Sequence, residues 1–378
     1  MKVTVVGGGV IGLACAWELM RGGADVVVLE SGSVGGGCSS GNAGWVCPSI
    51  AAPLPEPGMV REGFLQLVRR RGAFVLHPRL DVTFARWLWT FARSCRPARF
   101  EHGERAMKAL LDPTLELYDA YRDAGVDFEM HETGLVLVGL TDEGLAPYRR
   151  LHRMKEVGAE IEPAVDGSAV VGVLHGTIDR YVRPETLTAG LARSLRAGGA
   201  EIREHARVDS LRDVGGEKVV VAAGLATPRL LPQVRMPLIG ARGYSIDVAG
   251  TGTPPAHALY LAEARIGISP FNDTVRVAGI FEIGTRKPRP DAGAGLLAAA
   301  APYLEGWRPT GEGETWSDLR PATADGLPLI GEVATDLYVA AGHTMLGITL
   351  APATAALLAP LVLSGKRDPA LACFDPLR

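Results

Sequence analysis

The chain has 378 residues, of which 47% are hydrophobic and 21% charged, and its formal net charge at pH 7 is −3. This composition excludes a largely disordered chain and supplies enough apolar residues for a sizeable core. The 39 basic residues are balanced by 42 acidic ones, which excludes a strongly basic nucleic-acid-binding protein. The length exceeds that of a typical single core and predicts two domains.

Cysteine usage and hydrophobicity together indicate a cytoplasmic protein. The five cysteines are odd in number and follow no CxxC or metal-ligand spacing, so we expect free thiols and no metal site. The glycine-rich N-terminus is typical of a folded strand and turn rather than of an export signal. Residues 337–365 are apolar over a length that could cross a bilayer, but glycine and proline interrupt them, so we expect no spanning helix. Peripheral contact with the inner face of the cell membrane is compatible with this sequence.

The first thirty residues predict a strand, a helix and a second strand. Residues 2–6 and 26–29 are typical of short buried strands, and residues 10–21 are typical of a helix packed against them. This β-turn-α-β order is that of a dinucleotide-binding fold, which serves nicotinamide and flavin enzymes alike.

Three glycines in the first turn specify how a dinucleotide would be held. Gly7, Gly9 and Gly12 occupy the G-x-G-x-x-G positions, which permit a tight turn, backbone approach to a pyrophosphate and close helix packing. The helix N-terminus then faces the pyrophosphate. A carboxylate at the end of the second strand binds a ribose hydroxyl and disfavours a 2′-phosphate. The other predicted contacts of this unit are Val10, Ile11, Glu30 and Ser31.

The remaining elements follow in chain order. Residues 53–125 have a helical pattern rich in Arg, Trp and Phe, which is more typical of a core or a domain interface than of a cofactor site. Residues 147–157 predict a helix, "RPETLTAGLARSLRAGGAEI" an amphipathic helix and a strand, and "EKVVVAAG" a buried strand before a glycine turn. Residues 236–282 alternate as antiparallel strands do. The absence of a linker or repeat predicts that the two domains interleave.

Four motifs in a fixed order then point to one family. They are "CSSGNAGWVCPSIAAPLPEPG", "ARGYSIDV", "LRPATADGLPLIG" and "LYVAAGHTMLGITLAPATA". From residue 2 to about residue 365 the chain resembles the FAD-dependent D-amino acid oxidase superfamily, and most closely its bacterial D-amino acid dehydrogenases. The resemblance implies an α/β fold with a Rossmann-like FAD-binding domain interleaved with an α+β substrate domain built on an antiparallel sheet. The implied FAD-binding segments are residues 1–50, 150–232 and 318–378, and the implied substrate-binding segments are residues 51–149 and 233–317.

The resemblance also implies how FAD is bound. The small residues after the second strand would surround the flavin, a turn near residue 223 would border the adenosine, and a helix N-terminus would lie beside the flavin pyrimidine. Backbone N–H groups at a helix start stabilise the negative charge of a reduced flavin. Cys373 does not match a flavin-attaching cysteine, so non-covalent FAD is expected. The implied contacts are Ser39, Ser40, Asn42, Ala43, Gly44, Val208, Ala223, Gly224, Gly342, Met345, Leu346, Gly347 and Ile348.

Three residues carry the implied catalytic site. Arg320 matches the arginine that binds the substrate carboxylate, a task that suits its rigid, permanently charged fork. Tyr244 matches a position near the pocket, where its phenol would contact the carboxylate or shape the space over the flavin. His343 lies in the turn before the flavin helix. The alternatives are an interdomain salt bridge for the arginine, a core position for the tyrosine and a backbone-bonded ring for the histidine.

The implied reaction is oxidative deamination of a D-amino acid, including cyclic ones such as D-proline or hydroxy-D-proline. Hydride would pass from Cα to flavin N5 to give an imino acid, which hydrolyses to a 2-oxo acid. The electrons would then pass to a quinone, another carrier or dioxygen. Alternatives are a glycine or sarcosine-type amine oxidase, a flavin-bearing subunit of a heteromeric amino acid dehydrogenase, and, from the first motif alone, a nicotinamide dehydrogenase. Thr344 stands where relatives commonly have glycine, and the segment before "VVVAAG" is short.

Overall fold

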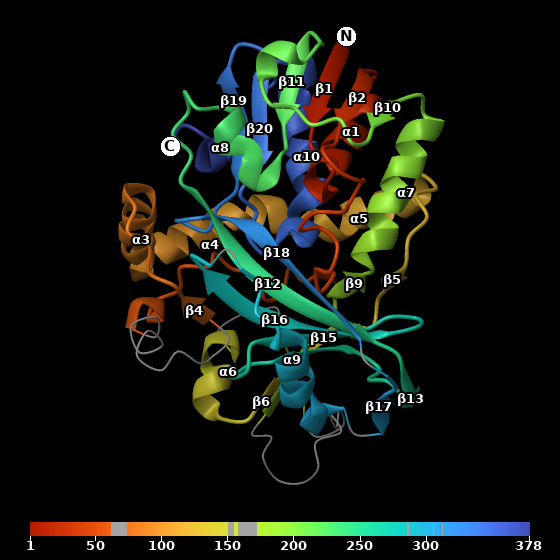
Figure 1. Cartoon of the computed structure of the whole chain (residues 1–378), viewed down its shortest axis with the longest axis vertical. Coiled ribbons are helices and arrows are strands. Elements are labelled where there is room, and N and C mark those ends of the chain that lie inside the picture. The colour runs from red at the N-terminus through yellow and green to blue at the C-terminus, as the bar shows by residue number, and fades with distance from the viewer. Residues whose placement is uncertain (62–73, 150–154, 158–171, 286, 305, 312) are drawn as a thin grey trace.

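A six-stranded sheet forms the upper half of the molecule in Figure 1. The computed structural model describes residues 1–61, 74–149, 155–157, 172–285, 287–304, 306–311 and 313–378. All neighbouring strands in this sheet are parallel except the last pair, which is antiparallel. In spatial order the strands are β10 (Glu201–Arg203), β2 (Asp25–Leu29), β1 (Lys2–Val6), β11 (Lys218–Val221), β20 (Leu337–Ala341) and β19 (Leu329–Ala334).

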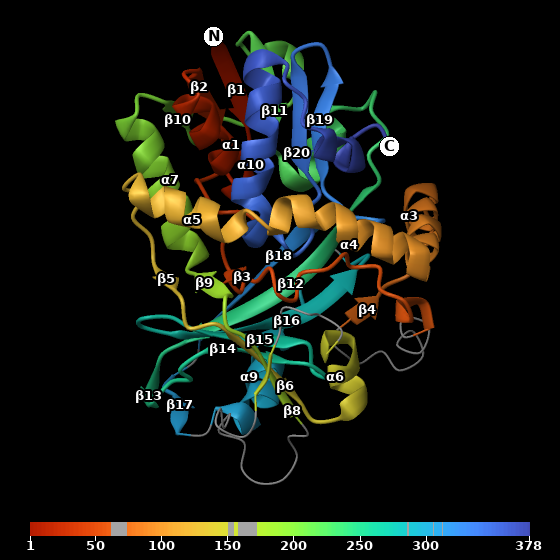
Figure 2. The ribbon, with the colours of Figure 1, turned by 180° about the vertical axis from the view of Figure 1, so that it is seen from behind.

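Both faces of this sheet are covered, because its strands are apolar on both sides. Alternate residues of β1, Val3 and Val5, pack with α1 (Val10–Arg21) and α10 (Gly347–Ser364) in one core, whereas Val6 packs with Leu230 on the other face. The first core also receives residues from α7 (Pro184–Ala197), α4 (Pro97–Leu111) and α5 (Thr114–Asp123). Figure 2 shows α4 and α5 lying across α10.

A larger, mainly antiparallel sheet crosses below the first one. Its strand order is β18 (Glu314–Thr323), β12 (Leu238–Val248), β16 (Val275–Ile283), β15 (Ile266–Pro270), β14 (Ala258–Leu261), β6 (Leu135–Gly139), β8 (Gly172–Gly176) and β7 (Lys155–Val157), with β4 (Phe74–Leu76) beside β16. The long strands β12 and β18 run from this sheet up to the first one (Figure 1). Smaller pairings join β3 (Trp45–Val46), β9 (Arg180–Val182) and β5 (Met130–His131), and join β13 (Gly250–Gly252) to β17 (Trp307–Pro309).

Shorter helices border the larger sheet. Helix α9 (Ala292–Ala300) packs on its outer face, and α3 (Val82–Ser94) stands at the edge of the molecule in both views. The other helices in the described residues are α6 (Asp142–Arg149) and α8 (Thr227–Leu230), with 3₁₀ turns at Leu211–Asp213, Gly224–Ala226, Ala301–Tyr303 and Pro369–Phe374. The α/β fold class expected from the sequence, with a Rossmann-like part and an antiparallel part, is confirmed.

Two features of the chain differ from the expectations. The helix expected at residues 147–157 is wrong at its C-terminal end: residues 147–149 belong to α6, residues 150–154 lie outside the described residues, and Lys155–Val157 is a strand paired with β8. β7 and β8 lie within the implied FAD-binding segment 150–232 but belong to the larger sheet. Likewise α4 and α5, inside the implied substrate segment, pack on the core of the first sheet; the Tyr118 hydroxyl donates to the Ile348 carbonyl at 2.8 Å.

Helix α10 is the one described helix that is long and apolar enough to span a membrane. About two-thirds of it, 67%, is buried inside the protein, where it packs on α1, α4 and α5. This packing accounts for its hydrophobicity, since a helix that is apolar all round is found in a protein core as well as in a membrane.

Candidate active site and cofactor site

The turn after β1 has the tight geometry that its glycines predict. Gly7 has a φ of +116°, and a Cβ there would lie 2.4 Å from the carbonyl oxygen of Ala222, the residue that follows β11. A Cβ on Gly12 would lie 1.9 Å from the Gly7 carbonyl oxygen, so a side chain at either position would force the turn apart. Gly12 therefore sets the packing of α1 and does not line a cavity.

A cavity of about 480 Å³ opens above this turn, at the carboxyl ends of β1, β2 and β11. This is where parallel α/β sheets bind their ligands. Fourteen of the residues predicted to bind the cofactor line it: Gly7, Gly9, Val10, Ile11, Glu30, Ser31, Ser39, Asn42, Val208, Ala223, Gly224, Gly342, Gly347 and Ile348. Ser40 and Gly44 do not line it. Ala43, Met345 and Leu346 line the neighbouring cavity instead.

Two helix N-termini face this cavity. Helix α1 begins after Gly9 and α10 after Leu346, and neither has a side-chain cap or an acidic residue in its first turn. The first amide of α1, from Val10, donates to Ser39 Oγ at 3.0 Å. The other N–H groups at a helix start have no helical partner and favour negative charge. This donor set suits a pyrophosphate at α1 and an electron-rich ring edge at α10.

Glu30 closes the β2 end of the cavity. Its Oε2 accepts from the Gly8 amide at 2.6 Å, and its Oε1 accepts from the Gly32 amide at 2.8 Å and from Ser31 Oγ at 3.0 Å. The carboxylate is thus fixed by backbone amides at the place where the sequence predicts a ribose hydroxyl. A 2′-phosphate would be repelled there by this fixed negative charge.

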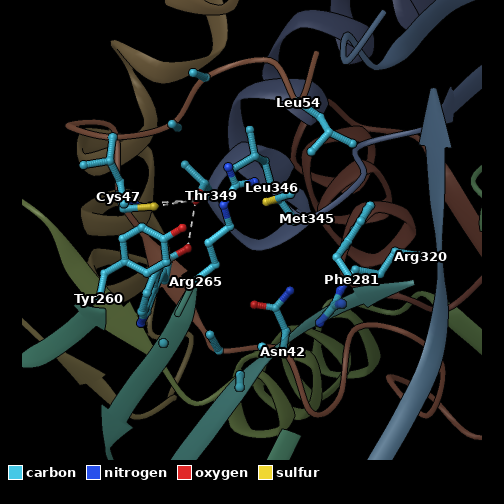
Figure 3. A pocket seen from close by; sticks show the side chains of 18 of the residues that line it. Asn42, Cys47, Leu54, Tyr260, Arg265, Phe281, Arg320, Met345, Leu346 and Thr349 are labelled. Carbon is cyan, nitrogen blue, oxygen red and sulfur yellow. Dashed lines mark hydrogen bonds between the residues drawn. The ribbon is translucent and has the colours of Figure 1, made fainter. Parts of the chain in front are cut away.

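A second cavity, of about 230 Å³, adjoins the first. Asn42 lines both cavities, and the turn at residues 342–349 contributes residues to each. Aromatic and apolar side chains form most of its wall, as Figure 3 shows in part. They include Trp45, Ile50, Leu54, Met59, Tyr148, Tyr260, Phe281, Met345 and Leu346.

Arg320 is placed in this second cavity by the pairing of β18 with β12. It lies opposite Ala241, and its guanidinium lies over Gly243, where a Cβ would be only 1.3 Å from Arg320 Nη1. The glycine in "RGYS" therefore leaves the space that the guanidinium occupies. Figure 3 shows Arg320 at the rim of the cavity beside Phe281.

The guanidinium of Arg320 is buried without a carboxylate partner. The residue is 8% exposed, and its Nε has no hydrogen-bond partner. It forms no ion pair with any residue that the structure describes. Burial lowers its pKa from the usual arginine value, although Cys38 and Asp318 partly oppose this effect. Burying an unpaired cation is costly, so this arrangement indicates a site for an anionic ligand group.

Tyr244 lies outside both cavities. It follows Gly243 in a strand, and successive side chains of a strand point to opposite faces. Its ring is fully buried in the core beneath α9, where its hydroxyl donates to Glu282 Oε2 at 2.6 Å and accepts from the Arg289 amide at 2.9 Å. The expectation that its phenol shapes the pocket is therefore corrected, and the core alternative describes it.

His343 borders the cofactor cavity, but its ring is held by the protein. Nε2 is bonded to Thr354 Oγ1 of α10 at 2.9 Å, and the backbone pairs with Ala322 beside Arg320. Burial lowers the pKa of this histidine from 6.5 to about 3, so the imidazole is neutral. These contacts describe a residue that fixes the turn before α10 rather than one that reacts. The next residue, Thr344, has a φ of +54°, which is strained for a β-branched side chain.

Several residues of the second cavity were not predicted from the sequence. Arg265, at the turn between β14 and β15, has a φ of +51° and brings a second positive charge to the wall that Figure 3 shows around Tyr260. Tyr148 and Tyr260 contact each other through their hydroxyls at 3.3 Å. These residues come from distant segments and carry no local motif, so only the tertiary fold brings them together.

The sheet is of the dinucleotide-binding type, with a large cavity at its carboxyl edge and an adjoining pocket that holds a buried arginine. These are the features of an enzyme that uses a nucleotide cofactor. Residues 2–361 match the family model described as DAO, FAD dependent oxidoreductase, and the chain belongs to this family. The protein is thus an FAD-dependent oxidoreductase. The cavity with two uncapped helix N-termini and an acidic strand end fits FAD.

Comparison with known proteins gives relatives over nearly the whole chain. The D-amino acid dehydrogenase of Phenylobacterium zucineum (strain HLK1) is 28% identical over 413 residues, which cover 99% of this chain and 96% of that protein. In fold the chain is similar to glycine oxidase from Geobacillus kaustophilus, with a TM-score of 0.72, 24% identity and coverage of 100% and 99%. It is also similar to dithionite-reduced L-α-glycerophosphate oxidase from Mycoplasma pneumoniae with FAD bound, with a TM-score of 0.70, 16% identity and coverage of 97% and 96%.

Proposed function

We propose that this protein oxidises the Cα–N bond of a D-amino acid and releases an imino acid that hydrolyses to a 2-oxo acid. The observation that carries the proposal is Arg320, a buried guanidinium without a carboxylate partner in a pocket beside the cofactor cavity. The relative from Phenylobacterium zucineum supports the same substrate class by its name. Bound FAD would supply the hydride acceptor.

The residues of the pocket have distinct roles in this proposal. Arg320 binds both oxygens of the substrate carboxylate, which fixes the orientation of Cα relative to the cofactor. The aromatic and apolar wall holds the substrate side chain and excludes water. No side chain is needed to take a proton if the amine binds in its neutral form.

The wall also favours one substrate range over the alternatives. Glycine and sarcosine have no side chain to contact Tyr148, Tyr260 or Met59, whereas a compact apolar group, including the ring of D-proline or hydroxy-D-proline, would bury surface there. A pocket lined by residues of this one chain, with its own proposed carboxylate site, also argues against a subunit that only relays electrons. The proposed enzyme is therefore active as an isolated chain.

An anaerobic titration of the purified FAD-bound protein tests this function. D- and L-amino acids, D-proline, glycine and sarcosine are added in turn, and the oxidised flavin absorbance is followed. We expect bleaching by D-amino acids with apolar side chains, none by their L-forms, and slower bleaching by glycine. Bleaching by the L-forms, or by none of these compounds, would refute the proposal.

Arg320→Met separates substrate binding from folding. We expect the rate of flavin reduction at low substrate concentration to fall about a thousandfold, because the bidentate pair between the guanidinium and the substrate carboxylate is lost. Each tenfold step in this loss corresponds to roughly 1.4 kcal/mol of binding free energy. The variant should nevertheless be at least as stable to unfolding as the wild type, because an unpaired buried charge is replaced by an apolar side chain. Tyr244→Phe is the control: it removes a buried hydrogen bond outside the pocket, so it should lower stability and leave substrate saturation unchanged. The reverse pattern would exclude Arg320 as the carboxylate site.

The FAD is proposed to be bound non-covalently. Cys38 is the cysteine that lines the cofactor cavity. Burial, with a further contribution from Asp318, raises the pKa of its thiol to about 11. The thiol is therefore protonated at neutral pH and is a poor nucleophile. Acid precipitation should leave all of the flavin in the supernatant.

The reduced enzyme is proposed to pass electrons to a quinone or a similar carrier at the inner face of the cell membrane. A surface around α3 supports this contact. Leu80, Val82 and Trp89 are exposed there, and Arg93 lies 4.5 Å over the Trp89 ring. Helix α3 contains two arginines and no acidic residue, so the surface is apolar and basic, as surfaces that dock on anionic lipid are.

A further inference from the structure

An ion network centred on a buried arginine lies behind the loop that contributes Asn42 to both cavities. Arg276 of β16 is 3% exposed, and its guanidinium binds Asp247 twice, from Nε to Oδ1 at 2.6 Å and from Nη2 to Oδ2 at 2.7 Å. Nη2 also donates to Oε1 of Glu185, in the first turn of α7, at 2.8 Å. Asp247 and Arg276 stand opposite each other on β12 and β16, so the sheet itself fixes this pair.

The network holds the backbone of the loop at two adjacent residues. Arg276 Nη1 donates to the carbonyl oxygen of Asn42 at 2.7 Å, and Glu185 Oε1 accepts from the amide of Gly41 at 2.9 Å. Residues from β16 and α7, two separate elements, therefore meet on one short stretch of loop. An ion network that only tied β12 to β16 would not need these loop contacts.

Arg276 and Glu185 both remain charged. Burial by itself would lower the pKa of Arg276, but its bonds with Asp247 outweigh this effect and raise the pKa. Burial would likewise raise the pKa of Glu185, but the charge of Arg276 and the Gly41 amide outweigh it and lower the pKa. Removing the guanidinium would leave the partly exposed carboxylates of Asp247 and Glu185 without this partner. The loop would lose its bond to Asn42, together with the group that holds Glu185 against Gly41.

The anchored loop places Asn42 between the two sites. Asn42 lines both cavities, and its Oδ1 accepts from the Gly44 amide at 2.9 Å. In Figure 3 its side chain projects into the pocket across from Leu346. The loop backbone packs closely on its neighbours, because a Cβ on Gly41 would lie 2.2 Å from the Trp316 ring and one on Gly44 would lie 1.9 Å from the Val182 carbonyl oxygen.

We propose that Arg276 is a positioning residue for both halves of the active site. Through the carbonyl oxygen of Asn42 and through Glu185 it fixes the loop at residues 41–44, and the loop sets where FAD and substrate meet. Small displacements of reacting groups cost large factors in rate. This inference goes beyond the proposed substrate and rests on the FAD site alone.

Arg276→Met is the first test, with FAD-bound protein and with apoprotein prepared from it. We expect the FAD dissociation constant to rise about tenfold and the rate of flavin reduction at saturating substrate to fall about tenfold. Measurements are made well below the unfolding temperature of each variant. The matched control is Arg180→Met, which breaks another two-bond arginine–aspartate pair, with Asp119; among the described residues, neither of these side chains bonds to residues 41–44. It should change neither quantity.

A double-mutant cycle with Asn42→Ala identifies the route of the effect. If Arg276 acts by positioning Asn42, the rate loss caused by Arg276→Met should vanish in the Asn42→Ala background. If the two losses multiply, the inference is wrong. It is equally wrong if Arg276→Met lowers only the unfolding temperature. Should Arg276→Met not fold, Asp247→Asn weakens the same anchor at constant size and is expected to raise the FAD dissociation constant severalfold.

The two proposals can fail separately. FAD affinity of the Arg276 variants is measured without any substrate, so it decides the positioning role even if no D-amino acid reduces the flavin. Conversely, normal FAD affinity in Arg276→Met would overturn this inference while leaving the D-amino acid titration of the wild type unaffected.

Discussion

His343 shows how burial rather than catalysis can explain a histidine beside a cofactor. Its ring is 5% exposed and bonded to Thr354, and burial lowers its pKa to about 3. The unfolded chain has an ordinary histidine, which takes up a proton below about pH 6.5. Between these two values the unfolded state therefore binds one proton that the folded state does not.

This difference predicts a pH-dependent stability with a definite sign. The contribution of His343 is fully present above about pH 6.5 and falls by about 1.4 kcal/mol per pH unit on acidification, down to about pH 3. Between pH 7 and pH 5 the free energy of unfolding should fall by about 2 kcal/mol less in His343→Gln than in the wild type. Urea titrations at the two pH values measure this difference. His102→Gln, an exposed position on α4, is the control. Equal pH dependence in His343→Gln and the wild type would show that the imidazole is not held neutral.

Tyr244 shows that a motif can mark the right strand without deciding which face of it a given side chain occupies. The motif "RGYS" correctly marks the strand that carries the pocket, but adjacent residues of a strand face opposite ways. Gly243 has to face Arg320, so Tyr244 faces the core. The sequence could have indicated this if the glycine, rather than the tyrosine, had been assigned to the pocket face.

Gly243 is also the clearest case of an element shaping the site. In β12 it is the position over which Arg320 of the neighbouring β18 lies, so the two strands together build the proposed carboxylate site. A methyl group there would displace the guanidinium, which is the mobile end of its side chain.

We therefore expect Gly243→Ala to weaken substrate binding. The rate of flavin reduction at low substrate concentration should fall about a hundredfold, because a misplacement of the bound substrate by about 1 Å costs a factor of this size. The affinity for FAD should stay unchanged. Gly240→Ala in the same strand is the control, because its Cβ would meet only the ends of Leu225 and Leu319. Stopped-flow reduction of both variants measures this. Equal rates in the two variants would mean that the guanidinium does not need its place over Gly243.

Among the elements, those with local signals could be predicted and those set by tertiary pairing could not. The glycine spacing and apolar periodicity gave α1 with the bounds that the structure has. Lys155–Val157 is a strand only because β8 pairs with it, and nothing within the segment distinguishes it from the end of a helix. The wall of the substrate cavity is likewise assembled from segments as distant as Trp45 and Phe281. Motifs reveal the residues that hold a common cofactor, whereas the substrate wall depends on packing.

At the scale of the whole molecule, α3 is set apart from the rest of the surface. Its inner face, with Phe84, Trp87 and Phe91, packs on the protein, as the aromatic pattern in the sequence indicated. Its outer face leaves Trp89 exposed, and the fully exposed Leu80 lies just before it. An indole beside arginines is the composition that favours the interface between lipid headgroups and water. This face is where we propose that the protein contacts the membrane.

Vesicle binding tests the membrane contact. The wild type should sediment with vesicles of phosphatidylglycerol and much less with phosphatidylcholine, because the arginines interact with anionic headgroups. Arg86→Gln and Arg93→Gln should each weaken binding about fivefold, since each basic residue near an anionic surface contributes about 1 kcal/mol. Trp89→Ser should weaken it further by removing the apolar anchor. Leu377→Ser is the control, because Leu377 is as exposed as Trp89 but lies near the C-terminus. If the α3 variants instead changed the oligomeric state and left vesicle binding intact, this surface would be a protein interface, and the electron acceptor would have to be sought in solution.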